Sequence, residues 1–273
     1  SEEKLSKFSG LDIVLSLPEP EAIEDEQDIR IAQSKNFIKP TKIYYEDGAQ
    51  VYLSSSQDHQ GKEGIMNLVF RTSSTSENVN NLVSANLLIA AFQKKNLRII
   101  QRAGQRGAFV IPAIDGVGNP LISMSGRTKR HTQYANDLID KFIDFEITER
   151  SLKDLKKLYV DSYESISELA VADQLEYHAL TTTKQAPYLY SQKQFLSALN
   201  SVTIDDVKEI HKKILESSFI DIYAHGNYSS DQIIEFAKSA REKVGVTSQQ
   251  TPWHYESEFE VKVGRGLVKR SEG

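Results

Sequence analysis

The chain has 273 residues, 26% of them charged, with a formal net charge of −5. Without a Lys/Arg-rich tract, this balance gives no electrostatic reason to expect a nucleic acid or an anionic membrane as partner. The absence of cysteine excludes disulfides and thiolate metal sites, and no apolar run reaches the roughly 18 residues that a membrane span needs.

Residues 1–36 are predicted to be a connector arm. Leu17-Pro18-Glu19-Pro20 interrupts regular structure, and the stretch Glu19–Asp28 carries six carboxylates with few apolar residues. Such a composition cannot drive burial, so the arm is expected on the surface. From about residue 37 the pattern changes to that of a folded domain, which we expect to extend to residue 244.

Two hairpins are predicted in this domain. The first has β-rich runs on either side of Asp47-Gly48, and a third strand, Ile65–Arg71, follows it. The second joins Ala108–Asp115 to Leu121–Ser125 through the turn formers at residues 116–120. A further strand is expected at Phe219–Ala224, ending in His225-Gly226-Asn227.

Amphipathic helices are predicted between and after these strands, from apolar residues at three- and four-residue spacing. Their expected ranges are Asn78–Arg102 with a bend at Gln93–Asn96, Thr132–Phe145, Thr148–Ala179, Gln192–Asn200, Ile204–Ser217 and Ser230–Lys243. Ser76 or Asn78 is expected to cap the first helix, Thr148 the third and Thr203 the fifth. The predicted buried stripe of the third helix is Leu152, Leu155, Leu158, Tyr159 and Tyr163.

Together these elements predict an α+β domain: a mainly antiparallel sheet of about five to six strands, packed on one face by helices. Residues 245–273 are predicted to form a linker and, at Glu256–Val263, an alternating strand without a partner in this domain.

No catalytic motif is present in the sequence. The six histidines are all more than five residues apart, so neither H-x-x-E-H nor H-E-x-x-H occurs: His59, His131, His178, His211, His225 and His254. Ser125-Gly126 lacks the G-x-S-x-G elbow, and the glycines at 104–107 and 116–118 match no nucleotide-binding loop. A site assembled from Arg106, Arg127 and His131 is one alternative; charges at strand ends are the other.

The arrangement resembles the homologous domains of the insulinase/pitrilysin family of zinc metallopeptidases. The resemblance covers roughly residues 37–244, and the connector Leu17–Pro20 resembles the entry to the third of four such domains in long-chain members. The segments that carry it are Ala103-Gly104, Gly116–Gly118, Ser125-Gly126, Phe145–Glu149 with Leu155-Lys156, Ser191-Gln192, Thr203–Val207 and His225-Gly226-Asn227.

The resemblance implies four related domains enclosing a chamber, with the zinc motif on the first helix after the opening strands of the first domain. The corresponding helix here, Asn78–Phe92, has no histidine or glutamate, so no catalytic, cofactor-binding or metal residue is expected in this chain. Zinc is expected in the catalytic domain of the parent protein. The final strand Phe259–Val263 resembles the opening strand of a fourth domain.

The resemblance therefore implies a non-catalytic domain in the C-terminal half of an insulysin-like endopeptidase, forming part of the chamber wall. The expected partners are the catalytic N-terminal half of the same polypeptide and peptide substrates, with no nucleic acid and no membrane. The alternative is a purely structural or interaction protein of the same fold, like the core subunits of the bc1 complex. The compartment stays open; long bacterial members point to the periplasm.

Overall fold

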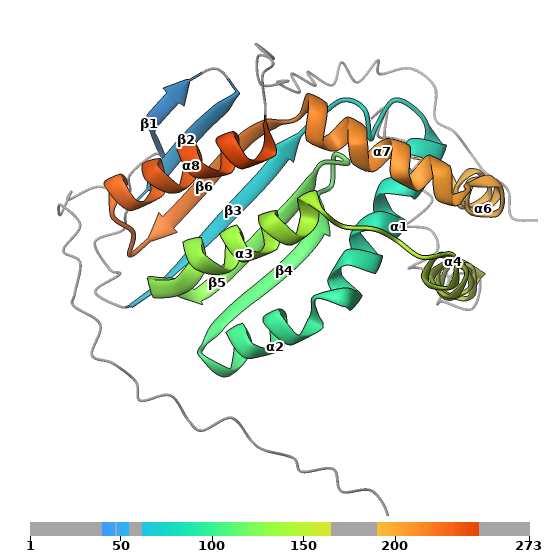
Figure 1. The fold of residues 1–273 in the computed structure, drawn as a ribbon, viewed down its shortest axis with the longest axis horizontal. Helices are drawn as coiled ribbons and strands as arrows, with labels where there is room; N and C mark the ends of the chain where they lie inside the picture. The colour runs from blue at the N-terminus through green and yellow to red at the C-terminus, as the bar shows by residue number, and fades with distance from the viewer. Residues whose placement is uncertain (1–39, 47, 55–61, 165–189, 246–273) are drawn as a thin grey trace, which may run out of the picture.

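The computed structural model describes residues 40–46, 48–54, 62–164 and 190–245. In this part of the chain six strands form one sheet in the order β1-β2-β6-β3-β5-β4 (Figure 1). All neighbouring strands are antiparallel except β2 and β6, which run parallel, so the predicted mainly antiparallel sheet is confirmed. The strands are β1 Thr41–Glu46, β2 Ala49–Ser54, β3 Glu63–Arg71, β4 Ala108–Ile114, β5 Pro120–Arg127 and β6 Phe219–Gly226.

Both predicted hairpins are present. β1 and β2 pair up to Glu46 opposite Ala49, on either side of the predicted Asp47-Gly48 turn. The β4–β5 turn is held by the Asp115 carboxylate, which accepts hydrogen bonds from the backbone N–H groups of Val117 (2.9 Å) and Asn119 (2.8 Å). Asp, Asn and Gly residues favour such turns, and these residues predicted the turn from the sequence.

The helices follow the predicted order. They are α1 Val79–Lys95, α2 Leu97–Gln105, α3 His131–Ile143, α4 Glu149–Glu164, α6 Gln192–Ser201, α7 Ile204–Ser217 and α8 Ser230–Val244, with a short 3-10 turn, η3, at Thr128–Arg130. The predicted first helix is divided at Asn96, inside the expected bend. The Asn96 side chain donates to the Phe92 carbonyl at 3.0 Å, which ends α1 there.

Side-chain caps fix several helix starts. Asn78, rather than Ser76, caps α1 by accepting from the N–H of Asn81 at 2.9 Å. At α7, Thr203 and Asp206 form a capping box, in which the Asp206 carboxylate accepts from the Thr203 N–H at 2.7 Å. The caps predicted at Asn78 and Thr203 are thus confirmed.

The predicted stripe of α4 is wrong at one position. Leu152 and Leu155 are buried, but Leu158 is 61% exposed. Among the described elements, α1 and α6 are the main packing partners of α4. At 100° per residue Leu158 lies about 120° around the helix from Leu152, so it falls outside this narrow contact. Tyr159 is partly buried in the core, whereas the side chain of Tyr163 and the predicted helix beyond Glu164 lie outside the described residues.

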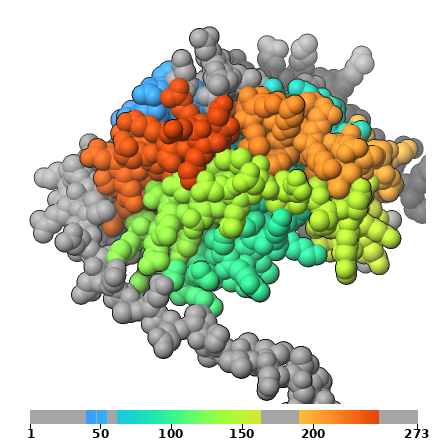
Figure 2. All heavy atoms as spheres, in the orientation of Figure 1, coloured from blue at the N-terminus to red at the C-terminus, as the bar shows by residue number. Residues whose placement is uncertain are grey.

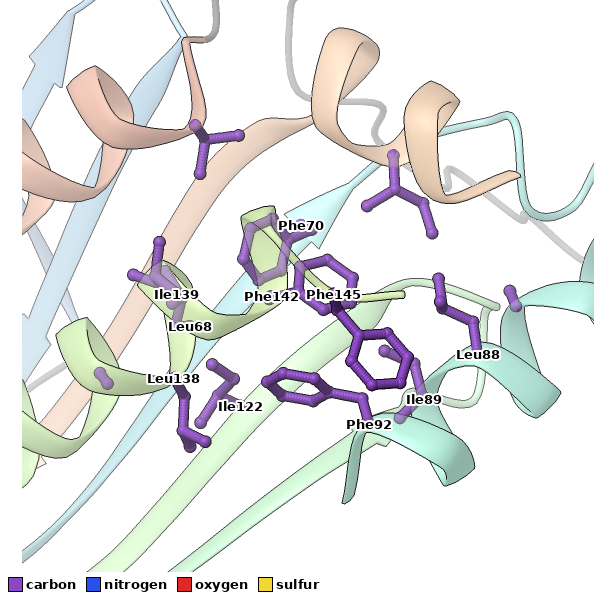
Figure 3. Packing of buried hydrophobic residues seen from close by; sticks show 14 of the residues in the cluster. Leu68, Phe70, Leu88, Ile89, Phe92, Ile122, Leu138, Ile139, Phe142 and Phe145 are labelled. Carbon is purple, nitrogen blue, oxygen red and sulfur yellow. The ribbon is translucent and has the colours of Figure 1, made fainter. Parts of the chain in front are cut away.

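The described helices cover one face of the sheet. Figure 2 shows α8, α3 and α7 side by side on this face. Beneath them lies an aromatic cluster in which Phe92 makes edge contacts with Phe142 (ring centroids 5.1 Å apart) and Phe145 (5.4 Å) (Figure 3). Phe70 of β3 packs on Phe142 at 5.7 Å. The core therefore joins α1, α3 and the central strand β3. It lies between the sheet and the helices that cover one of its faces.

The opposite face of the sheet carries exposed apolar side chains: Tyr45, Ile65, Phe109 and Ile111. Alternation is clearest in β4, where Phe109 is 62% exposed between the buried Ala108 and Val110. This period of two is typical of a sheet with one covered face.

The β4 edge of the sheet is shielded. The odd-numbered residues of β4 form the backbone hydrogen bonds to β5, since Gly107 and Asp115 bond to Arg127 and Asn119. The backbone N–H and C=O groups of Ala108 and Val110 therefore point away from β5, toward the edge of the sheet. Both residues are nevertheless buried, because α1 and α2 pack against β4. Pro112, at the next such position, has no N–H group, so pairing with a further strand is blocked.

The predicted arm at 1–36 and the linker and strand at 245–273 lie almost wholly outside the described residues, and the domain boundaries stay predictions. No helix in the described ranges is long and apolar enough to cross a bilayer.

Candidate functional site

His131, one of the three residues considered for an assembled site, is fully buried at the start of α3. Its Nδ1 atom lies 2.7 Å from the hydroxyl oxygen of Tyr228, which is also buried. Burial disfavours the imidazolium ion and lowers the pKa of His131 to about 4, although a backbone contact to Ser125 opposes this shift in part. Burial also raises the pKa of Tyr228. This pair is neutral at pH 7 and has no access to a substrate.

The His225-Gly226-Asn227 segment places Tyr228 in this pair. Gly226 has φ 112°, a conformation that favours glycine, and Asn227 donates its N–H to the Glu63 carbonyl at 3.1 Å. A Cβ on Gly64 would lie 2.7 Å from Cε2 of Tyr228 and 2.8 Å from Cγ2 of Thr128. Gly64 is therefore explained by the close approach of the Tyr228 ring. Gly226 is explained by its positive φ and by the β3 backbone, since an added Cβ would lie 2.7 Å from the Glu63 carbonyl oxygen.

Arg106 and Arg127, the other two residues of that alternative, both lie beside Gly107. Arg106 caps the C-terminal end of α2, and the N–H of Arg127 bonds to the Gly107 carbonyl at 2.9 Å. The Arg127 side chain lies over Gly107, where an added Cβ would meet its Cδ at 3.2 Å. Both arginines are thus next to Gly107, whereas the imidazole of His131 points into the core with Tyr228. The three residues do not form a catalytic site.

The other described histidines have separate partners. His211 bonds through Nε2 to the Phe142 carbonyl at 2.8 Å, and Nδ1 of His225 lies 2.6 Å from Oγ of Ser54. His59, His178 and His254 lie outside the described residues. Among the residues that the structure describes, no group of three His, Cys, Asp or Glu side chains could hold a metal ion.

A polar cluster that the sequence analysis missed lies on the face of the sheet opposite to the helices. Arg71 forms an ion pair through Nε with the fully buried Asp221 and donates through Nη2 to the Tyr223 hydroxyl at 2.9 Å. Tyr223 donates to Asp221 at 2.8 Å and stacks on Tyr52, with ring centroids 5.3 Å apart. Burial, and secondarily the Asp221 charge, raise the pKa of Tyr223 to about 12.

The one available signal for this cluster was a carboxylate, Asp221, inside an otherwise apolar strand. Asp221 pairs with two side chains of the cluster, Arg71 and Tyr223, and the arrangement is that of a structural ion pair.

A model of the family described as "Peptidase M16 inactive domain" matches residues 201–273. No curated protein matches the sequence.

Solved structures share the fold. The chain superposes on "Crystal Structure of pitrilysin" with a TM-score of 0.70 at 18% identity, covering 84% of this chain and 25% of that one. A peptidase M16 inactive domain from Pseudomonas fluorescens gives 0.56 at 14% identity, covering 76% and 51%. A conserved protein from Enterococcus faecalis V583 gives 0.55 at 14% identity, covering 71% and 50%.

This chain spans about a quarter of pitrilysin and about half of the other two proteins. At these identities the structures establish the fold, while the family model adds sequence similarity over residues 201–273. The two comparisons together confirm the predicted resemblance to a non-catalytic domain from the C-terminal half of an insulinase/pitrilysin-family peptidase.

Proposed function

We propose that this chain is a non-catalytic domain of a zinc metalloendopeptidase, and that it forms part of the wall of the chamber in which the parent enzyme degrades peptides. The observation that carries the proposal is the composition of α1. In the zinc-bearing domain of the family, the H-x-x-E-H motif lies on the first helix after the opening strands. α1 has that place here and contains no histidine or glutamate.

α1 has a structural role instead. Its buried side chains lie on more than one face, because the helix packs against β4 and also against α4, α6 and α7. Leu88 and Phe92, both buried, belong to this packing. A zinc ion has no ligand on this helix, so the residues present do not fit the metal, and bond cleavage is assigned to another domain of the parent.

The share of pitrilysin that this chain covers supports the proposed role as part of the chamber wall. A chain that corresponds to a quarter of pitrilysin is expected to act with further domains, which in the proposal are the catalytic N-terminal half and its peptide substrates. In this assembly the domain contributes closure and size selection.

Two measurements test the proposal. The purified 273-residue chain is expected to bind no stoichiometric zinc by metal analysis and to cleave no peptide; a tightly bound zinc would contradict the inactive assignment.

The parent's two halves, expressed separately, are then mixed. Peptide cleavage by the N-terminal half should rise at least tenfold when the half containing this domain is added. An unchanged rate, or a gene without an upstream H-x-x-E-H, would favour the bc1-like structural alternative.

A further inference from the structure

Part of the sheet face opposite to the described helices carries apolar side chains at positions that point to solvent. Phe109 is 62% exposed, Ile65 50% and Ile111 49%. In an antiparallel sheet with one covered face, the other face usually carries polar residues at these positions. Exposed apolar side chains that lie together mark surfaces that bind a partner or a ligand, so their placement relative to one another decides what they mean.

The strand register places these three side chains around β5. In one row across the sheet, Ser125 of β5 lies between Ile65 of β3 and Phe109 of β4. The next row, two residues further along each strand, has the same arrangement. The alternating residues Met66 and Met124 belong to the core on the helix side, so both rows lie on the opposite face. We call them the open-face patch: Ile65, Ser125 and Phe109, then Asn67, Ser123 and Ile111.

The patch has apolar sides and a polar middle. β3 and β4 are about 10 Å apart, because β5 lies between them and neighbouring strands are separated by about 4.8 Å. The two serine side chains of β5 are much shorter than Ile65 on one side and Phe109 on the other. The middle of the patch, along β5, is therefore lower than its sides.

This middle has unused hydrogen-bonding capacity. Neither the Ser123 nor the Ser125 hydroxyl bonds to any residue in the part of the chain that the structure describes, and both side chains are partly exposed. Beside them, the Oδ1 atom of Asn67 also has no hydrogen-bond partner among the described residues. A ligand with both donors and acceptors would satisfy these groups.

Charge gives the patch no preference for either sign. None of its six residues is charged. At one end, Glu63 and Arg127 lie opposite each other in the β3–β5 register, so the charges next to the patch are of both signs. An uncharged ligand segment fits this surface, since a charged one would lose hydration without gaining a partner.

We infer that the open-face patch binds an uncharged, extended segment of a peptide, whose apolar side chains contact the Ile65 and Phe109 sides. The inference rests on the proposed function, in which peptides are degraded beside this domain. An extended backbone has free N–H and C=O groups for the hydroxyls of Ser123 and Ser125. A helix, or the sheet of a second copy, has already paired these groups internally and would leave the hydroxyls buried without partners.

Fluorescence anisotropy on the 273-residue chain tests the inference. The probe is a dye-labelled nonapeptide in which Val and Ser alternate around a central Phe. It is expected to bind saturably, with an affinity that changes less than about twofold between about 50 and about 500 mM NaCl, because no charge takes part. Phe109→Ser with Ile111→Ser should weaken binding by about fivefold or more, since the variant removes apolar contact area.

Ser123→Leu separates this site from general apolar adhesion. The larger side chain fills the middle of the patch and removes a hydroxyl, so binding should weaken by about fivefold or more, whereas adhesion to an apolar surface would become stronger. Leu158→Ser is the matched control, because Leu158 on α4 is 61% exposed, close to the value for Phe109, and its loss should leave the affinity unchanged. Circular dichroism checks that each variant is folded.

Three results overturn the inference. The first is no saturable binding by the wild-type chain, or binding by Ser123→Leu as tight as wild type. The second is a dimer by sedimentation that Phe109→Ser with Ile111→Ser converts to a monomer, which would assign the patch to a second copy. The third is binding lost in the parent half that contains this domain, which would assign the patch to a contact between domains. The zinc analysis and the mixing of halves do not depend on the patch, so they test the proposed function separately.

Discussion

Nδ1 of His131 lies 2.7 Å from the hydroxyl oxygen of Tyr228, and this contact joins the start of α3 to the segment after β6 across 97 residues of sequence. Both side chains are buried, and the Tyr228 ring packs directly against Gly64 of β3. The pair therefore ties together three separate parts of the domain at one end of the sheet.

Acid should destabilise the domain through His131. Its pKa is about 4 in the fold against an ordinary value of 6.5, so between these pH values the unfolded chain binds more protons than the folded one. The contribution of His131 to the free energy of unfolding should be constant above pH 6.5, fall as the pH drops toward 4, and level off below. The loss from this group is at most about 3 kcal/mol. Urea unfolding across this pH range measures it, and His131→Phe should make the decline smaller, leaving the part due to His211, whose pKa burial also lowers. A decline of unchanged size in this variant would contradict the assignment to His131.

Gly64→Ala should destabilise the domain by roughly 1–3 kcal/mol, because the new methyl group meets the Tyr228 ring and the backbone carbonyl of His225, each at 2.7 Å. Gly104→Ala is the matched control. Apart from its chain neighbours and the α2 backbone, no described atom lies within 4 Å of the methyl group it would add, and alanine is the better helix former in α2, so a gain of about 0.5–1 kcal/mol is expected. Thermal unfolding compares the two variants; equal effects would contradict the close packing at Gly64.

Arg71→Ala should cost roughly 3–5 kcal/mol of unfolding free energy, since it leaves the fully buried Asp221 carboxylate without its cation. Arg71→Met combined with Asp221→Leu removes both charges and should be markedly less destabilising than Arg71→Ala alone. The exposed pair Lys212–Glu216 provides the control, where Lys212→Ala should change stability by less than about 0.5 kcal/mol. A double variant as unstable as Arg71→Ala would mean that the pair itself is required.

Thr203→Ala should destabilise the start of α7 by about 1 kcal/mol, because it removes the hydroxyl that accepts from the Asp206 N–H. Hydrogen bonds from the backbone and side chain of Thr203 lower the pKa of Asp206, so this stabilisation is present above the usual pKa of an aspartate and is lost as the pH falls through the lowered value. Thr203→Ser keeps the hydroxyl and should retain most of the stability. Denaturant unfolding at pH 7 separates the two; a Ser variant as weak as Ala would contradict the capping role.

The sequence predicted the local elements well and the candidate site poorly. The turn residues predicted both hairpins, and the sequence also predicted the bend near Asn96. Arg106, Arg127 and His131 could be grouped only as polar residues near one another in sequence. Whether they shared a surface depended on Tyr228, which lies almost a hundred residues further along and holds the His131 ring inside the core. The stripe of α4 was mistaken at Leu158 because its packing partners α1 and α6 are distant in sequence.

The sequence by itself determined where strands and helices begin and end, since caps such as Asn78 and turns such as Asp115–Asn119 act within about four residues. It also determined that α1 lacks zinc ligands. The tertiary structure alone decided that β6 enters the sheet between β2 and β3, and that Asp221 finds Arg71 across 150 residues. It also placed the Arg127 side chain over Gly107, just after the end of α2. These relationships depend on long-range packing, in which the burial of one segment fixes the neighbours of another, and no local pattern encodes that choice.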